Sequence, residues 1–92
     1  MSEQMDFLTL EQLCSACALE RDWLVERVRE GLIPATGGSD LEWRFTTTTL
    51  SRVRRMREIE RTYEAAPELA ALVADMLEEL DALRARLRRE GR

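Results

Sequence analysis

The chain has 92 residues, of which 45% are hydrophobic and 35% charged, with a formal net charge of −4 and no histidine. A domain of this size buries a modest core and rarely holds a substrate cleft as well, and without histidine it lacks the commonest acid–base group and metal ligand. We therefore expect no enzyme, no cofactor and no metal site.

Every basic residue is arginine, and eighteen acidic residues outnumber the fourteen arginines. Such a chain is repelled by phosphate backbones and anionic membranes unless its cations cluster on one face. Residues 1–10 carry acids where a secretory signal needs cations, and no apolar run is long enough to span a bilayer. We expect a cytoplasmic protein with a basic partner, and no membrane contact.

Two short helices are expected near the start of the chain. Thr9 and Gln12 have the spacing of a capping box, which predicts a helix over residues 10–17. Its apolar face holds Leu10, Leu13, Cys14 and Cys17. A second helix is expected over residues 20–30, ending at Gly31. Two short helices joined by a tight turn form a helix-turn-helix.

A β-hairpin is expected after this helix pair. Residues 32–34 form one strand, residues 37–40 supply the turn, and residues 41–45 alternate apolar and polar with a period of two. The hairpin would bury Leu41, Trp43 and Phe45. The sequence therefore predicts a mainly α fold, a winged helix-turn-helix with a small β-hairpin wing.

Two longer helices complete the chain. Thr46 or Thr47 is expected to cap a third helix reaching about residue 65, and Pro67 suits the first turn of a fourth helix that runs through residue 89. The third helix has apolar contacts at Leu50, Val53, Ile59 and Tyr63. We place the winged domain at residues 1–66 and a long amphipathic helix at residues 67–92.

The last helix carries apolar residues at alternating spacings of four and three, which is typical of a coiled coil. Its expected dimer seam consists of Val73, Met76, Leu80, Leu83 and Leu87. A homodimer is the simplest source of a partner helix for this seam. A helix folded back on the third helix of the same chain is the alternative.

This order of elements resembles the MerR-like winged-helix group. The residues that carry the resemblance are Leu24, Arg29-Glu30-Gly31-Leu32-Ile33-Pro34, Trp43-Arg44-Phe45, Leu50 and Val53. Within that group the chain is most similar to the CbpM chaperone-modulator family, in which a segment like Arg52-Val53-Arg54-Arg55 leads into a long helix rich in leucine and acids. The linker Tyr63-Glu64-Ala65-Ala66-Pro67 departs from the family's usual Leu-Gly-Val-Asn.

The resemblance implies a bacterial chaperone modulator. Members of that family bind the J-domain of a DnaJ-like, curved-DNA-binding co-chaperone and block its stimulation of the Hsp70 chaperone. The alternative is a small MerR-like transcriptional regulator that binds DNA as a dimer.

The charge of the second helix favours the protein partner. With Leu24 at the centre of the core face, the opposite face holds Asp22, Glu26 and Glu30, with Trp23 beside them. Carboxylates there would be repelled by phosphates, whereas they suit the basic helix of a J-domain. We expect these four residues to form the partner-binding surface, with Trp23 as an exposed anchor. The alternative is a solvated helix face with Trp23 packed against the first helix.

Two further clusters have structural explanations. Residues 46–66 contain five arginines and three acids, and the i,i+4 spacing of Arg54 and Glu58 favours ion pairing over phosphate contact. Cys14 and Cys17 have the spacing of a redox or metal motif. No second pair and no histidine completes a zinc site, so core packing is favoured.

Overall fold

The structure, a computed structural model, describes residues 7–91. The chain divides into two compact units, which we call unit 1 (Met1–Arg54) and unit 2 (Arg55–Arg92), and each is described by itself. Residues 1–6, part of the segment interpreted above as lacking a secretory signal, lie outside the described residues, as does residue 92.

Helix α1 (Leu10–Cys17) begins at a capping box and ends in a left-handed turn. The Thr9 N–H donates to Gln12 Oε1 at 2.9 Å, and the Gln12 N–H donates to Thr9 Oγ1 at 3.1 Å. At the other end Ala18 has φ 54°, and the Leu19 N–H donates to the Cys14 carbonyl at 2.9 Å. The predicted capping box and helix bounds are confirmed.

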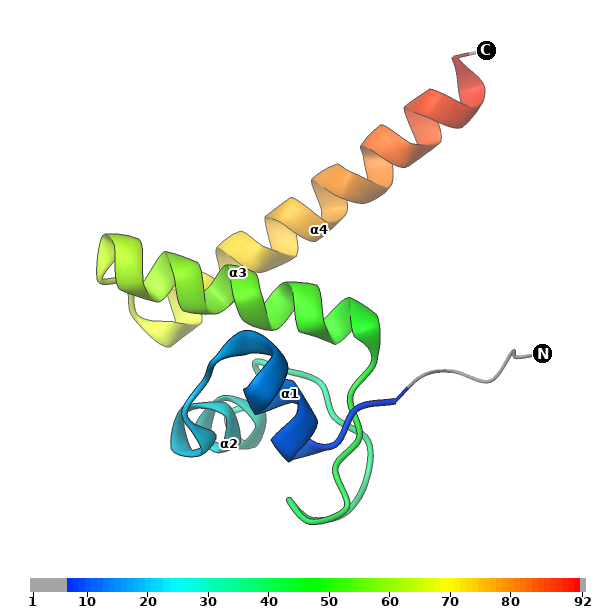
Figure 1. Ribbon diagram of the computed structural model, residues 1–92. Coiled ribbons are helices and arrows are strands. Elements are labelled where there is room, and N and C mark those ends of the chain that lie inside the picture. The colour runs from blue at the N-terminus through cyan, green and yellow to red at the C-terminus, as the bar shows by residue number, and fades with distance from the viewer. Residues whose placement is uncertain (1–6, 92) are drawn as a thin grey trace, which may run out of the picture. The chain divides into compact units, whose positions relative to one another are not determined.

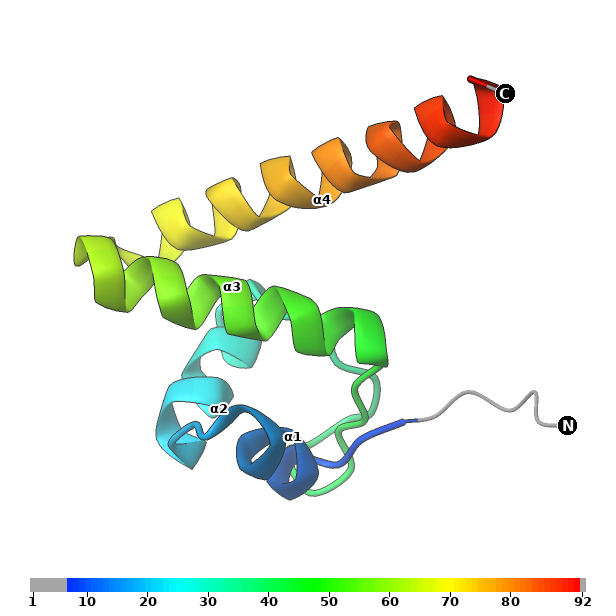
Figure 2. The ribbon, with the colours of Figure 1, turned by 45° about the horizontal axis from the view of Figure 1, so that its top comes forward.

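Helix α2 (Arg21–Arg29) packs against α1 and ends at a glycine. Figures 1 and 2 show the two short helices side by side within unit 1. Gly31 has φ 80°, which lets the Leu32 N–H reach the Arg27 carbonyl at 3.0 Å. The helix-turn-helix is therefore present, and Gly31 ends its second helix as predicted.

The core of unit 1 draws on both short helices, the segment that follows them and the start of α3 (Thr47–Tyr63). Its largest fully buried side chains are Leu10, Leu13, Leu24, Ile33, Phe45 and Val53. The rings of Trp43 and Phe45 meet edge to face with centroids 6.4 Å apart. The expected burial of these two aromatic residues is confirmed.

Two arginines near the start of α3 bind backbone carbonyls of α1 and of the segment after α2. Arg52 Nε donates to the Leu32 carbonyl at 2.8 Å, and Arg54 Nη2 donates to the Ala16 carbonyl at 3.3 Å in the last turn of α1. Carbonyls in the last turn of a helix, such as that of Ala16, are unsatisfied and carry partial negative charge, which a guanidinium neutralises. These contacts give the Arg-rich segment a structural role.

The expected β-hairpin wing is not formed. Strand-type backbone pairing among the described residues is limited to two isolated antiparallel β-bridges, Thr36 with Arg44 and Leu8 with Phe45. The first cannot extend towards Pro34, which has no N–H to donate. Phe45, moreover, exchanges both hydrogen bonds with Leu8, outside the expected hairpin. Residues 34–44 are therefore a bridged loop, here called the wing loop.

The tip of the wing loop is a tight turn that exposes a leucine. The Glu42 N–H donates to the Ser39 carbonyl at 2.8 Å, and the Gly38 N–H donates to Glu42 Oε1 at 3.2 Å. Leu41 is 81% exposed, so its expected burial is wrong. The alternation expected of a strand does not apply here, because Leu41 lies in the turn.

Unit 2 contains residues 55–63 of α3 and the long helix α4 (Pro67–Glu90). Glu64, with φ 52°, and Pro67, at the start of α4, mark the turn between the helices. Arg55 Nη2 lies 2.6 Å from Asp81 Oδ2, so an ion pair joins the two helices. Figures 1 and 2 show α4 turning back from the end of α3.

The leucine-rich side of α4 is largely uncovered. Small residues supply its buried side, namely Ala70, Ala71 and Ala74. The large apolar residues exposed on α4 are Leu69, Leu72, Met76, Leu80, Leu83 and Leu87. Tyr63, at the end of α3, is also exposed, so its expected core contact is wrong. No helix of the described residues is long and apolar enough to cross a bilayer.

Replacing Gly37 with alanine should destabilise the protein more than replacing its neighbour Gly38. Gly37 has φ 113°, and an added Cβ would lie 2.5 Å from the Glu42 carbonyl oxygen, whereas at Gly38 the nearest atom would be Glu42 Oε1 at 3.4 Å. We expect Gly37→Ala to lower the free energy of unfolding by about 2–3 kcal/mol and Gly38→Ala by less than about 1 kcal/mol. Urea unfolding followed by circular dichroism measures both. Equal losses would contradict this turn geometry.

Candidate partner-binding site

The outward side of α2 carries a row of carboxylates. Asp22, Glu26 and Glu30 are all exposed, and they lie four residues apart along the helix and its C-terminal cap. Residues at this spacing share one helix face. The structure thus brings together three of the four residues that the sequence indicated, and we call them the acidic row.

Arg27 lies against the acidic row, and its side chain is only 9% exposed. Its Nη1 lies 3.4 Å from Glu26 Oε1 and 3.7 Å from Glu30 Oε1. The guanidinium carbon also lies 5.0 Å from the centroid of the Trp23 ring, in a cation–π contact. A buried charge without such partners would cost several kcal/mol. The two carboxylates and the indole together hold this cation.

Trp23 is buried, so the expectation of an exposed aromatic anchor is wrong. The reason is the width of the buried face of α2, which includes Trp23, Leu24, Val25 and Arg27. A core stripe centred on Leu24 alone would leave Trp23 beside the polar side of the helix. In the structure the Arg27 guanidinium stacks on the Trp23 ring and covers it. Trp23 therefore supports the acidic row through Arg27 and is not available to a partner as a surface anchor.

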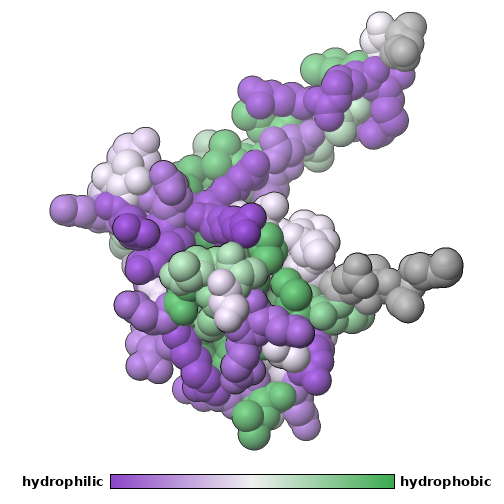
Figure 3. Space-filling view, in the orientation of Figure 1, coloured by the Kyte–Doolittle hydropathy of each residue, from purple (hydrophilic) through white to green (hydrophobic). Residues whose placement is uncertain are grey.

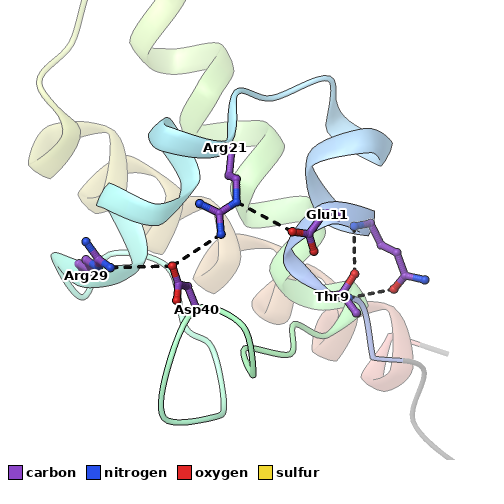
Figure 4. A network of polar contacts seen from close by, with 6 residues as sticks. Thr9, Glu11, Arg21, Arg29 and Asp40 are labelled. Carbon is purple, nitrogen blue, oxygen red and sulfur yellow. Dashed lines mark hydrogen bonds and ion pairs between the residues drawn. The ribbon is translucent and has the colours of Figure 1, made fainter.

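The other two arginines of α2 share one carboxylate of the wing loop. Arg21 Nη2 and Arg29 Nη2 lie 3.6 Å and 3.9 Å from Asp40 Oδ2, and Arg21 Nε lies 3.9 Å from Glu11 Oε2. Figure 4 shows Asp40 between the two guanidinium groups. Pairs as exposed as these add little to stability. With these pairs, every arginine of α2 has a carboxylate partner within unit 1.

The outward side of α2 is therefore electrostatically negative. In a DNA-binding helix-turn-helix, the second helix presents donors and cations to the major groove and the backbone. Here the cations of that helix are occupied by carboxylates of the fold, and the acidic row faces solvent. A cationic surface complements this arrangement, and a phosphate backbone does not.

The cysteine pair has no sign of reactivity. Cys14 and Cys17 are free thiols, each half-buried on α1. Burial, assisted by the negative charge of Glu11, raises the pKa of the Cys14 thiol above its ordinary value. A raised pKa disfavours the thiolate, which is the nucleophile and the metal ligand. No group of three or more His, Cys, Asp or Glu side chains among residues 7–91 could hold a metal ion.

A second feature of unit 1 is an open hollow of about 300 Å³ beside the wing loop. Its lining includes Pro34, Thr36, Arg44 and Thr49. The Thr49 hydroxyl is engaged with Thr46 Oγ1 at 3.1 Å. Of the residues that line this hollow, only Arg44 is ionisable, so it has no acid–base pair for catalysis.

Sequence reasoning missed Arg27 and Asp40, the two residues that organise the site. A signal for Arg27 was present, because Trp23 and Arg27 are four residues apart and Arg27 and Glu30 are three apart on a helix. Asp40 had no comparable signal, because its partners Arg21 and Arg29 are distant in sequence.

The expected dimer seam lies in unit 2, far in sequence from the acidic row of unit 1. Met76, Leu80, Leu83 and Leu87 are exposed, and Val73 is half-buried. Self-association through these residues stays a prediction.

Known proteins similar to this chain are regulators. The family described as MerR HTH family regulatory protein matches residues 8–90. A "Chaperone modulatory protein CbpM" of Pseudomonas entomophila (strain L48) is 29% identical over 77 residues, which cover 84% of this chain and 76% of the relative. A protein of the same name from Coxiella burnetii (strain Dugway 5J108-111) is 29% identical over 86 residues, covering 94% and 81%. No solved structure matches the chain.

These similarities confirm the resemblance found in the sequence, since the relatives bear the name of the chaperone modulators. The family match extends over all four helices and includes the helix-turn-helix described above. This chain belongs to the MerR HTH family of regulatory proteins.

Proposed function

We propose that this chain is a chaperone modulator, and not an enzyme, that binds the J-domain of a DnaJ-like, curved-DNA-binding co-chaperone and inhibits its stimulation of Hsp70. The observation that carries the proposal is the negative outward side of α2. The names of the similar proteins support the connection with chaperones. The proposal includes the cytoplasmic location expected from the sequence.

The acidic row supplies the physical basis for this binding. A J-domain presents a basic helix to Hsp70. The acidic row together with Glu11 and Asp40 gives five carboxylates against the three arginines of α2, which leaves a net negative surface to attract that helix. Arg27 also limits the motion of Glu26 and Glu30, which lowers the entropy lost on binding. A co-chaperone held in this way could not offer the same basic helix to Hsp70, so inhibition follows from competition.

Removing charge from the acidic row should weaken J-domain binding. The double variant Asp22→Lys/Glu26→Gln changes the charge by three units and leaves an amide oxygen near Arg27. We expect isothermal titration calorimetry to show a dissociation constant raised about tenfold or more. The unaltered protein should also suppress the J-domain-stimulated ATPase of Hsp70, and the variant should suppress it less at equal concentration.

The matched control is Glu64→Lys/Glu79→Gln, which makes the same charge change at two exposed residues of unit 2. It should bind the J-domain as the unaltered protein does. Equal weakening by both double variants would show that net charge alone drives association. Unchanged affinity in the α2 variant would place the binding surface elsewhere.

A DNA-binding regulator is the second candidate, and the family match is the observation that favours it. The paired arginines and the acidic row of α2 argue against it. We expect no binding of labelled duplex DNA by fluorescence anisotropy even at low salt, where phosphate contacts are strongest. Binding that weakens steeply as salt rises would support the DNA-binding function instead.

We infer that the chain forms a homodimer through the α4 seam. Exposed apolar residues along one helix are poorly accommodated in water, and a second copy offers the same seam. Residues 67–81 contain five acids and no arginine, whereas residues 82–90 contain four arginines and one acid. An antiparallel pair places the acidic half of each helix beside the basic half of the other. The charges therefore favour that orientation.

Polar substitution in the seam should dissociate this dimer. We expect sedimentation velocity at micromolar concentrations to give a dimer for the unaltered protein and a monomer for Leu80→Gln/Leu83→Gln, because two apolar contacts in each copy are lost. The control Leu72→Gln changes an exposed leucine of α4 outside the seam and should remain dimeric. A monomeric unaltered protein would contradict the inference.

A further inference from the structure

We propose that Leu41, at the tip of the wing loop, is the apolar anchor of the partner-binding site and docks on the basic J-domain helix that the acidic row attracts. This inference rests on the proposed function, because the occupant is the same J-domain. It assigns the anchoring role, first expected of Trp23, to a residue that no sequence pattern marked as exposed.

Single exposed leucines are ordinary on protein surfaces, so exposure by itself does not mark Leu41 as a binding residue. Both sequence neighbours of Leu41 in the wing loop have partners. On one side, Asp40 lies within 3.6 Å of Arg21 and 3.9 Å of Arg29. On the other, Glu42 closes the turn through its N–H and its carboxylate. An apolar side chain displayed on an ordered turn loses little conformational entropy when a partner covers it.

Leu41 is also tied to the acidic row. Arg29 follows Asp22 by seven residues, which on an α-helix is nearly the same direction, so Arg29 belongs to the face that carries the row. Since Arg29 binds Asp40, the residue before Leu41 is joined to the edge of that face. Figure 4 shows the wing loop beside α2 with Asp40 facing both arginines. The space-filling view in Figure 3 shows a hydrophobic projection at the lower edge of unit 1, beside hydrophilic surface.

This combination fits a helix that carries cations on one face and an apolar residue next to them. The carboxylates would contact the cations, and Leu41 would cover the apolar residue, as buried anchors do at the centre of protein interfaces. Duplex DNA fits poorly. The tip of the wing loop, residues 38–42, contains two acids and no cation, so it would approach phosphates with like charge.

The test is calorimetric titration of the J-domain with the unaltered protein and three variants. Leu41→Ala should raise the dissociation constant about tenfold, and Leu41→Met, which keeps an apolar side chain, should stay within about twofold of the unaltered protein. Leu72→Ala, at an exposed leucine of α4, is the matched control and should bind unchanged. Because Leu41 is 81% exposed, thermal unfolding of Leu41→Ala should match that of the unaltered protein.

Salt dependence separates the anchor from the acidic row. Leu41→Ala removes no charge, so its affinity should fall with salt as steeply as that of the unaltered protein, whereas Asp22→Lys/Glu26→Gln should flatten that dependence. Equal affinity of Leu41→Ala and the unaltered protein would overturn this inference and leave the proposed function standing. Absence of any J-domain binding by the unaltered protein would overturn both.

Discussion

The largely buried Arg27 guanidinium of α2 contacts the Trp23 ring and the carboxylates of Glu26 and Glu30. Arginine keeps its charge throughout the physiological pH range, and a charge removed from water must be paired. Glu26 and Glu30 supply this pairing, together with the indole of Trp23. Two carboxylates of the acidic row are thus linked to the interior of unit 1.

The same use of arginine recurs through unit 1. Arg54 binds a carbonyl in the last turn of α1, and Arg52 binds one beyond the end of α2. Arg21 and Arg29 pair with Asp40 of the wing loop. In a helix-turn-helix that binds DNA, cations at such positions would point outwards to phosphates. In this chain they bind parts of the fold to one another. The family scaffold is kept, while the cations of its second helix are paired within the fold.

Local signals made the helices predictable from the sequence. The capping box of Thr9 and Gln12, the C-terminal Gly31 and the N-terminal Pro67 each act within a few residues, and the observed helix bounds agree with them. The wing was not predictable in this way, because Phe45 pairs with Leu8 instead of within a hairpin. The predicted exposure of Trp23 and the predicted burial of Leu41 were wrong for a related reason. Trp23 is covered by Arg27, and Leu41 lies in a turn. A hydrophobic period describes neither feature.

The Leu8–Phe45 bridge has a consequence for the order in which unit 1 folds. Its two hydrogen bonds, of 2.7 Å and 2.8 Å, join residues separated by the whole helix-turn-helix and the wing loop. Closing a loop of that length costs about 3 kcal/mol of chain entropy before any contact compensates it. The contacts between α1 and α2 are local, and when they form first they order much of the chain between Leu8 and Phe45 and lower the entropy cost of closing that loop. We therefore expect formation of the helix pair to favour the bridge at the base of the wing loop.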